Sequence, residues 1–331
     1  MRRPIRLVSG IVVVALTLAA SPFARAQSAT NRTYQDQGEY YLFSQAVQDA
    51  RDPASQIGDL NSWAQKYPDS DFQDVRAAML AEAYSQLDPP QPAKVLEYAA
   101  QLMSKDLKTV FDDPRDGPAQ LLRFLYAATG AAGAAGTALL PNPTPDQADA
   151  GWAAAQQLKT AAAAFFAPFN KPAATSPADW NKSRVQMEAA ADRTLLVLEI
   201  YPAETVMKKN PRVSAECRDI AEPAYRRALA DFPDRAYVSY RLALAFLCQQ
   251  KESPEKIFPA VYEFERAAVL DPTLGGAQPD AAVIPAYADK AYVAVHGSAD
   301  GLDELKRLVK QSALPPADFR FKTAAEIAGG Q

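Results

Sequence analysis

The chain has 331 residues, of which 48% are hydrophobic and 22% charged, and this composition supports a sizeable core and argues against disorder. Its 35 basic and 39 acidic residues give a formal net charge of −4. Four of the arginines lie in the first 26 residues, which hold no acid, so the remainder carries 31 basic and 39 acidic residues, a net charge of −8. This negative charge argues against nucleic acid and anionic membrane surfaces as partners.

The N-terminal segment has the three parts of a secretory signal peptide. Arginines stand at positions 2, 3 and 6, an apolar run follows over residues 7–20, and Ala24 and Ala26 fit the small-x-small rule for cleavage. We predict a signal peptide over residues 1–26, cleavage after Ala26, and a periplasmic or secreted mature chain. The alternative is an uncleaved anchor, but the run is shorter than the roughly 20 residues that span a bilayer. No later run reaches that length, so no membrane span is expected after cleavage.

The remaining residues, 27–331, read as one series of helices. Ala is abundant, β-branched residues are sparse, and breaks marked by Pro or Gly recur about every 15 to 20 residues. No stretch shows the apolar–polar alternation of a strand. We therefore predict an all-α fold. The expected helices cover residues 34–51, 53–66, 71–87, 91–105, 117–132, 144–166, 177–206, 213–231, 235–250, 255–270, 279–295 and 300–311.

The segment 128–178 departs from this regular spacing. Glycine- and proline-rich stretches near both of its ends indicate loops, so it is a candidate boundary between an N-terminal and a C-terminal lobe. The alternative, which we favour, is a continuous array of helices, because four aromatic side chains of this segment need burial. They are Trp152, Phe165, Phe166 and Phe169.

A pattern of small, aromatic, small and proline residues occurs twice, with spacings of 4, 3 and 5. The two copies are Ala221-Tyr225-Ala228-Pro233 and Ala260-Phe264-Ala267-Pro272. Between them, Leu242, Ala243 and Phe246 follow a related pattern, and a partial copy begins near Trp63. The two prolines are 39 residues apart, and the extra length falls in 249–254. The chain therefore contains internal repeats.

These residues resemble the tetratricopeptide repeat, or TPR. The resemblance implies antiparallel helical hairpins stacked as a right-handed α-solenoid, since one hairpin cannot bury its apolar face alone. Small residues let two helices approach closely, the aromatic ring fills the gap to the next hairpin, and Pro ends the helix. The C-terminal segment from His296 to Phe319 is similar to exported TPR proteins of soil bacteria such as the Acidobacteria, a likeness that implies no activity. The alternative is a generic helical bundle.

The resemblance also implies where a partner binds, because the first helix of each hairpin lines the concave surface of a TPR array. The candidate partner-binding residues are Tyr237, Tyr240, Arg241 and Leu244 in the clearest unit, and Phe72 and Arg76, with Val75 and Met79, near the N-terminus. The Lys and Asn with which some family members hold a peptide carboxylate are replaced by Tyr240 and Leu244, so carboxylate capture is not expected. The tyrosines could equally pack between helices.

Few residues suggest catalysis or metal binding. The single histidine, His296, rules out multi-histidine zinc and iron sites, and its place before Gly297 suits a cation at a helix end. The glycine-rich stretch 130–136 lacks the Lys-Ser/Thr ending of a phosphate loop. Ser253-Pro-Glu-Lys256 matches a Ser-x-x-Lys motif, but a helix cap explains these residues. We expect no catalytic residue, no metal and no cofactor.

The two cysteines stand equally far from the expected turn at Phe232-Pro233. Residues equidistant from the turn of an antiparallel hairpin lie at the same height, and exported compartments often permit disulfides. We therefore predict a Cys217–Cys248 disulfide. The alternative is a pair of buried thiols that face apart.

The sequence thus favours an exported scaffold or adaptor, not an enzyme, that binds protein or peptide partners in the cell envelope. One alternative is a helical polysaccharide-binding domain or an unrecognised enzyme, which a cleft of buried acids and aromatic walls would indicate. Another is a structural envelope protein that self-associates. The tail around Phe319 and Phe321 is expected to fold back as a cap, and the sequence indicates neither the partner nor the oligomeric state.

Overall fold

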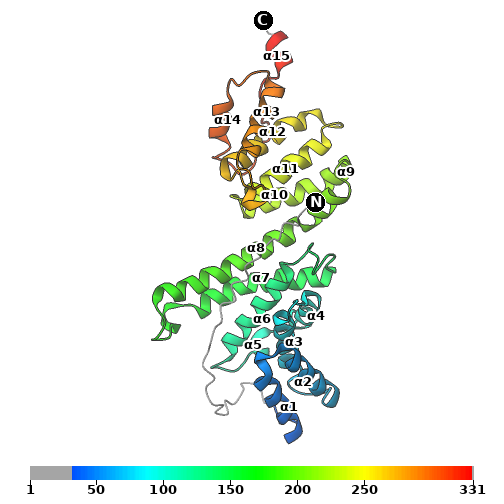
Figure 1. The fold of residues 1–331 in the computed structure, drawn as a ribbon, viewed down its shortest axis with the longest axis vertical. Coiled ribbons are helices and arrows are strands. Elements are labelled where there is room, and N and C mark those ends of the chain that lie inside the picture. The colour runs from blue at the N-terminus through cyan, green and yellow to red at the C-terminus, as the bar shows by residue number, and fades with distance from the viewer. Residues whose placement is uncertain (1–31, 330–331) are drawn as a thin grey trace, which may run out of the picture. The chain divides into compact units, whose positions relative to one another are not determined.

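The computed structural model describes residues 32–329, and its regular structure is helical (Figure 1). Within this range there is no strand, and the one isolated β-bridge joins Ala135 and Leu140. The prediction of an all-α fold is confirmed for these residues. The predicted signal peptide, residues 1–26, lies outside them. None of the described helices combines the length and hydropathy needed to cross a membrane.

Two compact units can be distinguished. Unit 1 takes residues up to Ala131 together with Asp149–Ala191, and unit 2 takes Ala132–Ala148 together with the residues from Asp192 onward. All three dividing points fall inside helices, the first at the last residue of α6 (Gly117–Ala132) and the second in the first turn of α7 (Pro145–Phe165). The third falls inside the long helix α8 (Pro177–Lys209), so α8 contributes residues to both units.

Unit 1 begins with helices that pack in sequence, α1 on α2, α2 on α3 and α3 on α4. In chain order its helices are α1 (Gln37–Gln48), α2 (Pro53–Lys66), α3 (Gln73–Gln86), α4 (Pro92–Met103), the short α5 (Leu107–Val110), α6 (Gly117–Ala132), α7 (Pro145–Phe165) and the first part of α8. Asp36 and Asp52 begin the first two helices, each accepting a hydrogen bond from a backbone N–H of the first turn. These two helices therefore begin at local capping signals.

Trp63 is the central side chain of the N-terminal part of unit 1. It is fully buried, and its Nε1 donates to Glu39 Oε1 at 3.0 Å. The ring of Phe43 meets it edge-on at 5.8 Å between centroids. Leu60 and Leu80 belong to the same cluster. The indole therefore fills this core and also satisfies a buried carboxylate, which lowers the cost of burying both polar groups.

Unit 2 contains the repeated pattern. Its helices after α8 are α9 (Ser214–Glu216), a π-helical turn (Cys217–Ala221), α10 (Glu222–Asp231), α11 (Ala236–Gln249), α12 (Ile257–Leu270), α13 (Val283–His296), α14 (Leu302–Leu308) and α15 (Ala324–Gly329). Successive helices from α10 to α13 pack on one another. The helix expected over 213–231 is thus interrupted by the π-helical turn, and the one expected over 279–295 begins later, at Val283.

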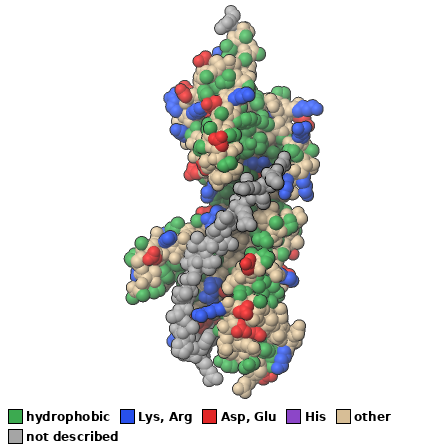
Figure 2. Space-filling view, in the orientation of Figure 1, with side chains coloured by type: hydrophobic (Ala, Val, Ile, Leu, Met, Phe, Trp, Pro, Cys, Tyr) green, Lys and Arg blue, Asp and Glu red, His purple; other side chains and the backbone are tan. Residues whose placement is uncertain are grey.

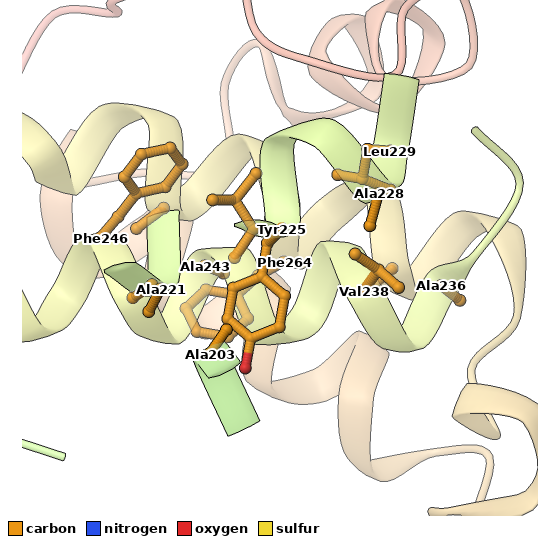
Figure 3. Packing of buried hydrophobic residues seen from close by; sticks show 14 of the residues in the cluster. Ala203, Ala221, Tyr225, Ala228, Leu229, Ala236, Val238, Ala243, Phe246 and Phe264 are labelled. Atoms are coloured by element: carbon orange, nitrogen blue, oxygen red, sulfur yellow. The ribbon is translucent and has the colours of Figure 1, made fainter. Parts of the chain in front are cut away.

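The small and aromatic positions of both repeat copies are buried. Tyr225 and Phe264 are at most 1% exposed, and so are the alanines on either side of each. Figure 3 shows side chains of α10, α11 and α12 converging in this core. The helices α10 and α12 end at Asp231 and Leu270, and their C-caps, Phe232 and Asp271, come directly before Pro233 and Pro272. The sequence pattern therefore corresponds to equivalent packing positions in two successive hairpins.

The C-terminal tail packs back on α12 and α13. The ring of Phe319 lies 5.0 Å from that of Tyr262, and the ring of Phe321 lies 4.9 Å from that of Tyr292, both measured between centroids. Arg266 Nε and Tyr262 Oη donate to the carbonyl of Ser312 at 2.9 and 3.0 Å. The tail thus covers the aromatic side chains of α12 and α13, as a cap does.

The aromatic side chains at the end of α7 are not all buried. Of the four expected to need burial, Phe166 is buried, Trp152 and Phe165 are half-buried, and Phe169, in the short 3-10 turn Pro168–Asn170, is 87% exposed. The expectation that Phe169 needs burial is therefore wrong. The turn places its side chain beyond the ends of both helices, where no neighbouring element covers it.

Candidate binding pocket

A pocket of about 640 Å³ opens in unit 2 beside the C-terminal end of α8 and one face of α11. Its lining residues are Met207, Pro211, Arg212, Arg241, Leu244, Leu247, Cys248, Gln250, Lys251 and Pro254. Two of the predicted partner-binding residues, Arg241 and Leu244, are among them. The helix α11 supplies these side chains because its opposite face, with Leu242, Ala243 and Phe246, is buried in the core.

The lining combines apolar side chains with positive charge. Met207, Leu244 and Leu247 supply apolar surface, and Arg212 and Lys251 are exposed cations. None of the lining residues is acidic or aromatic. Such a pocket suits an extended segment that presents an apolar side chain next to a negative charge.

Arg241 is held in place by a partner within unit 2. Its Nε lies 2.8 Å from Glu204 Oε1 and 3.3 Å from Tyr225 Oη, and Tyr225 Oη donates to the same carboxylate oxygen at 2.8 Å. Burial by itself lowers the pKa of Arg241, but the neighbouring Tyr225 and Glu204 raise it above its ordinary value. Burial, followed by the charge of Glu204, also raises the pKa of Tyr225. This triad joins α8, α10 and α11, so Arg241 positions the pocket wall and keeps its charge.

A disulfide joins Cys217 and Cys248 beside the pocket, with the two Cα atoms 6.3 Å apart. Cys248 lines the pocket, while Cys217 is buried in the π-helical turn. Cys217 Sγ lies 3.7 Å from the sulfur of Met207, another lining residue. The cross-link therefore ties the π-helical turn to the C-terminal end of α11, where the pocket wall forms.

Tyr237 and Tyr240 lie on α11 but do not line the pocket. Both are partly buried against the unit 2 core, and the ring of Tyr240 meets Phe264 edge-on at 5.7 Å. Burial is the main cause that raises the pKa of Tyr237. These contacts fit the alternative of packing between helices, and a role for the two tyrosines in partner binding stays a prediction.

The two residues predicted near the N-terminus take part in the packing of unit 1. Arg76 is buried, its Nη1 donates to the carbonyl of Tyr67 at 3.1 Å, and its guanidinium lies 5.3 Å from the centre of the Trp63 ring. The ring of Phe72 stacks on that of Tyr34 with centroids 4.4 Å apart. These internal contacts leave Arg76 little surface to offer a partner, whereas Phe72 is half-buried and its role in partner binding stays a prediction.

His296 lies at the C-terminal end of α13 and contacts the tail. His296 Nδ1 lies 2.7 Å from the carbonyl of Lys322, at the end of α13, where Gly297 takes the left-handed backbone conformation (φ 95°). Among residues 32–329 there is no group of three or more His, Cys, Asp or Glu side chains that could hold a metal ion.

Arg212 and Lys251 were not singled out from the sequence. A signal for the first was available, because Lys208, Lys209 and Arg212 lie close together with no acid among them. For Lys251 the sequence offers no such signal, because it is one lysine in a polar loop and only the fold brings it to the rim of the pocket.

Comparisons with family models, with curated proteins and with solved structures find no match to this chain.

Proposed function

We propose that this chain is an exported TPR-like scaffold that binds a protein or peptide partner in the cell envelope. In this proposal its antiparallel hairpins stack as a right-handed solenoid, and α10 and α12 are the second helices of successive repeats. The supporting observation is that Tyr225 and Phe264, with the alanines around them, occupy equivalent buried positions in consecutive hairpins that end before Pro233 and Pro272. Repeats of this kind expose one face of the first helix, here α11, to a partner.

The side chains that line the pocket on α11 indicate which chemical groups the partner would present. An extended segment would place an apolar side chain against Leu244 and Leu247 and a carboxylate near Arg212 and Lys251. Because Arg241 is already paired with Glu204, the two exposed cations provide the free charge. A polysaccharide-binding or catalytic site is less well supported, since no carboxylate or aromatic ring lines this pocket.

A cross-linked pull-down tests the proposal. The tagged chain is recovered from the envelope fraction of its source cells after chemical cross-linking, and bound proteins are identified by mass spectrometry. We expect a reproducible protein partner that is lost from the double variant Arg212→Glu/Lys251→Glu. The control, Lys290→Glu/Lys310→Glu, reverses two exposed lysines elsewhere in unit 2 and should retain the partner. Equal recovery with both double variants, or recovery of cell-wall polysaccharide without protein, would overturn the proposal.

A further inference from the structure

The hairpin formed by α7 and α8 ends in an apolar tip with few charged side chains. No Asp or Glu occurs between Asp149 and Asp179, although acids outnumber bases in the chain as a whole. Residues 160–178 contain a single charged side chain, that of Lys171. A second lysine, Lys182, is exposed in the second turn of α8. Asp179, in the first turn of α8, is also exposed, so Lys171 and Lys182 against this one acid leave the tip with a net charge of +1 in a chain that is otherwise acidic.

Phe169 projects from this tip. At 87% it has the largest exposed fraction among the large hydrophobic residues that the structure describes. The prolines on either side of its turn, Pro168 and Pro172, are exposed as well, as are Ala173 and Ala174. Figure 2 shows hydrophobic side chains gathered at the end of the hairpin that points to the left of the view. Single exposed apolar residues are common, whereas exposed apolar residues that are grouped together are a feature of interaction sites.

The turn that presents Phe169 is braced from behind. The rings of Phe165, Phe166 and Trp180 lie 4.6 to 5.7 Å apart between centroids. Asn170 Nδ2 donates to the carbonyls of Ala164 and Phe165 at 3.1 and 3.3 Å, which ends α7. Lys171 Nζ donates to the carbonyl of Thr175 at 2.7 Å. These contacts order the backbone turn that carries Phe169, so the turn itself need not be ordered on binding.

We propose that this tip is a contact site for an anionic phospholipid surface, with Phe169 entering the interfacial region and Lys171 and Lys182 lying near the headgroups. Aromatic side chains favour the membrane interface, and a nearby lysine adds attraction to anionic lipid. No acid occurs over residues 150–178, and Asp179 is the one acid between Lys171 and Lys182, so the tip repels an anionic surface less than the rest of the chain does. The net charge of the whole chain argues against such a surface, but screening limits that repulsion to short distances. The proposal is independent of the pocket on α11.

Vesicle sedimentation measures the proposed binding. The full chain is mixed with vesicles of phosphatidylglycerol and phosphatidylcholine, or of phosphatidylcholine alone, and all variants share the same N-terminus. We expect Phe169→Ser to weaken binding to the anionic vesicles about tenfold or more, the order expected for one lost aromatic side chain. Lys182→Glu should weaken it by at least about fivefold. Tyr41→Ser, which removes a ring that is 65% exposed on α1, is the matched control and should bind like the wild type.

A site-specific probe separates insertion of the tip from other contacts. Both native cysteines are in the disulfide, so Phe169→Cys offers one thiol for an environment-sensitive dye. A blue shift of the dye with anionic vesicles, absent for dye at Tyr41→Cys, is the expected result. Wild-type binding that Phe169→Ser leaves unchanged, no binding at all, or no shift at position 169 would overturn the proposal. Capture of a protein by the tip without any vesicle binding would assign it to a protein partner instead.

Discussion

Glu263 on α12 is a fully buried carboxyl group. Replacing it by a neutral side chain tests how the unit 2 core is held together. Burial raises its pKa to about 8, an effect larger than the opposite influence of Ser239, Arg266 and Arg226 around it. The ordinary value is 4.5. Between these two values the folded chain holds a proton on Glu263 that the unfolded chain has lost.

The sign of the pH dependence follows from this difference. The unfolded state binds fewer protons than the folded state between pH 4.5 and 8, so the folded state loses stability as pH rises through this window. At about 1.4 kcal/mol per pH unit, the cost of Glu263 is about 3 kcal/mol at pH 7. Glu263→Gln keeps the shape and removes the charge. We expect the variant to be about 3 kcal/mol more stable than the wild type at pH 7 and nearly equal to it at pH 4.

Urea unfolding followed by circular dichroism at pH 4, 5.5, 7 and 8 measures this difference. Glu304→Gln is the control, because the Glu304 side chain is exposed on α14 and its loss should change stability by less than about 0.5 kcal/mol at every pH. A stability difference between Glu263→Gln and the wild type that does not grow with pH would refute the reasoning. So would a variant that is less stable throughout.

Three further perturbations probe the same unit. Replacing Cys217 and Cys248 by Ser should lower the free energy of unfolding by about 3 to 4 kcal/mol, measured by denaturant titration, and an unchanged value would show that the cross-link contributes nothing. Burial acts to raise the pKa of Glu222, but hydrogen bonds, led by the one from Lys256, hold it below its usual range. Glu222→Gln removes the charge that these bonds stabilise and should lower the free energy of unfolding by about 1 to 3 kcal/mol at pH 7. That loss should shrink as pH falls below the ordinary pKa of 4.5; a constant loss would contradict the assignment. Truncation after Pro316 removes the tail from α12 and α13 and should lower Tm and solubility, whereas unchanged values would show that the tail is no cap.

The sequence predicted those features that rest on repeated or local patterns. The small and aromatic positions of the two repeat copies are buried because spacings of 4 and 3 place them on one helix face. The all-helical fold follows from composition and periodicity. Cys217 and Cys248 form a disulfide in the structure, and the sequence predicts this pair because the two cysteines are equally far from one turn. Each of these inferences uses information carried within about one hairpin.

Features that depend on neighbours distant in sequence could not be predicted in this way. Arg241 forms an ion pair with Glu204, 37 residues earlier in the chain. A residue that was expected to contact a partner therefore also makes a contact within the fold. Arg76 is buried because Trp63 and Tyr67 fold over it, which its own helix does not reveal. Phe169 was expected to be buried because of its hydrophobicity, but its exposure follows from the turn that ends α7.

Photo-crosslinking from the pocket tests the central claim most directly. A photo-crosslinking residue is placed at Leu244, which lines the pocket, and in a second chain at Val283, which is 43% exposed on α13 and does not line it. The proposed scaffold function predicts a protein adduct of defined mass from Leu244 in intact source cells and none from Val283. The same adducts from both positions, or no protein adduct from Leu244, would contradict a partner-binding role for this pocket.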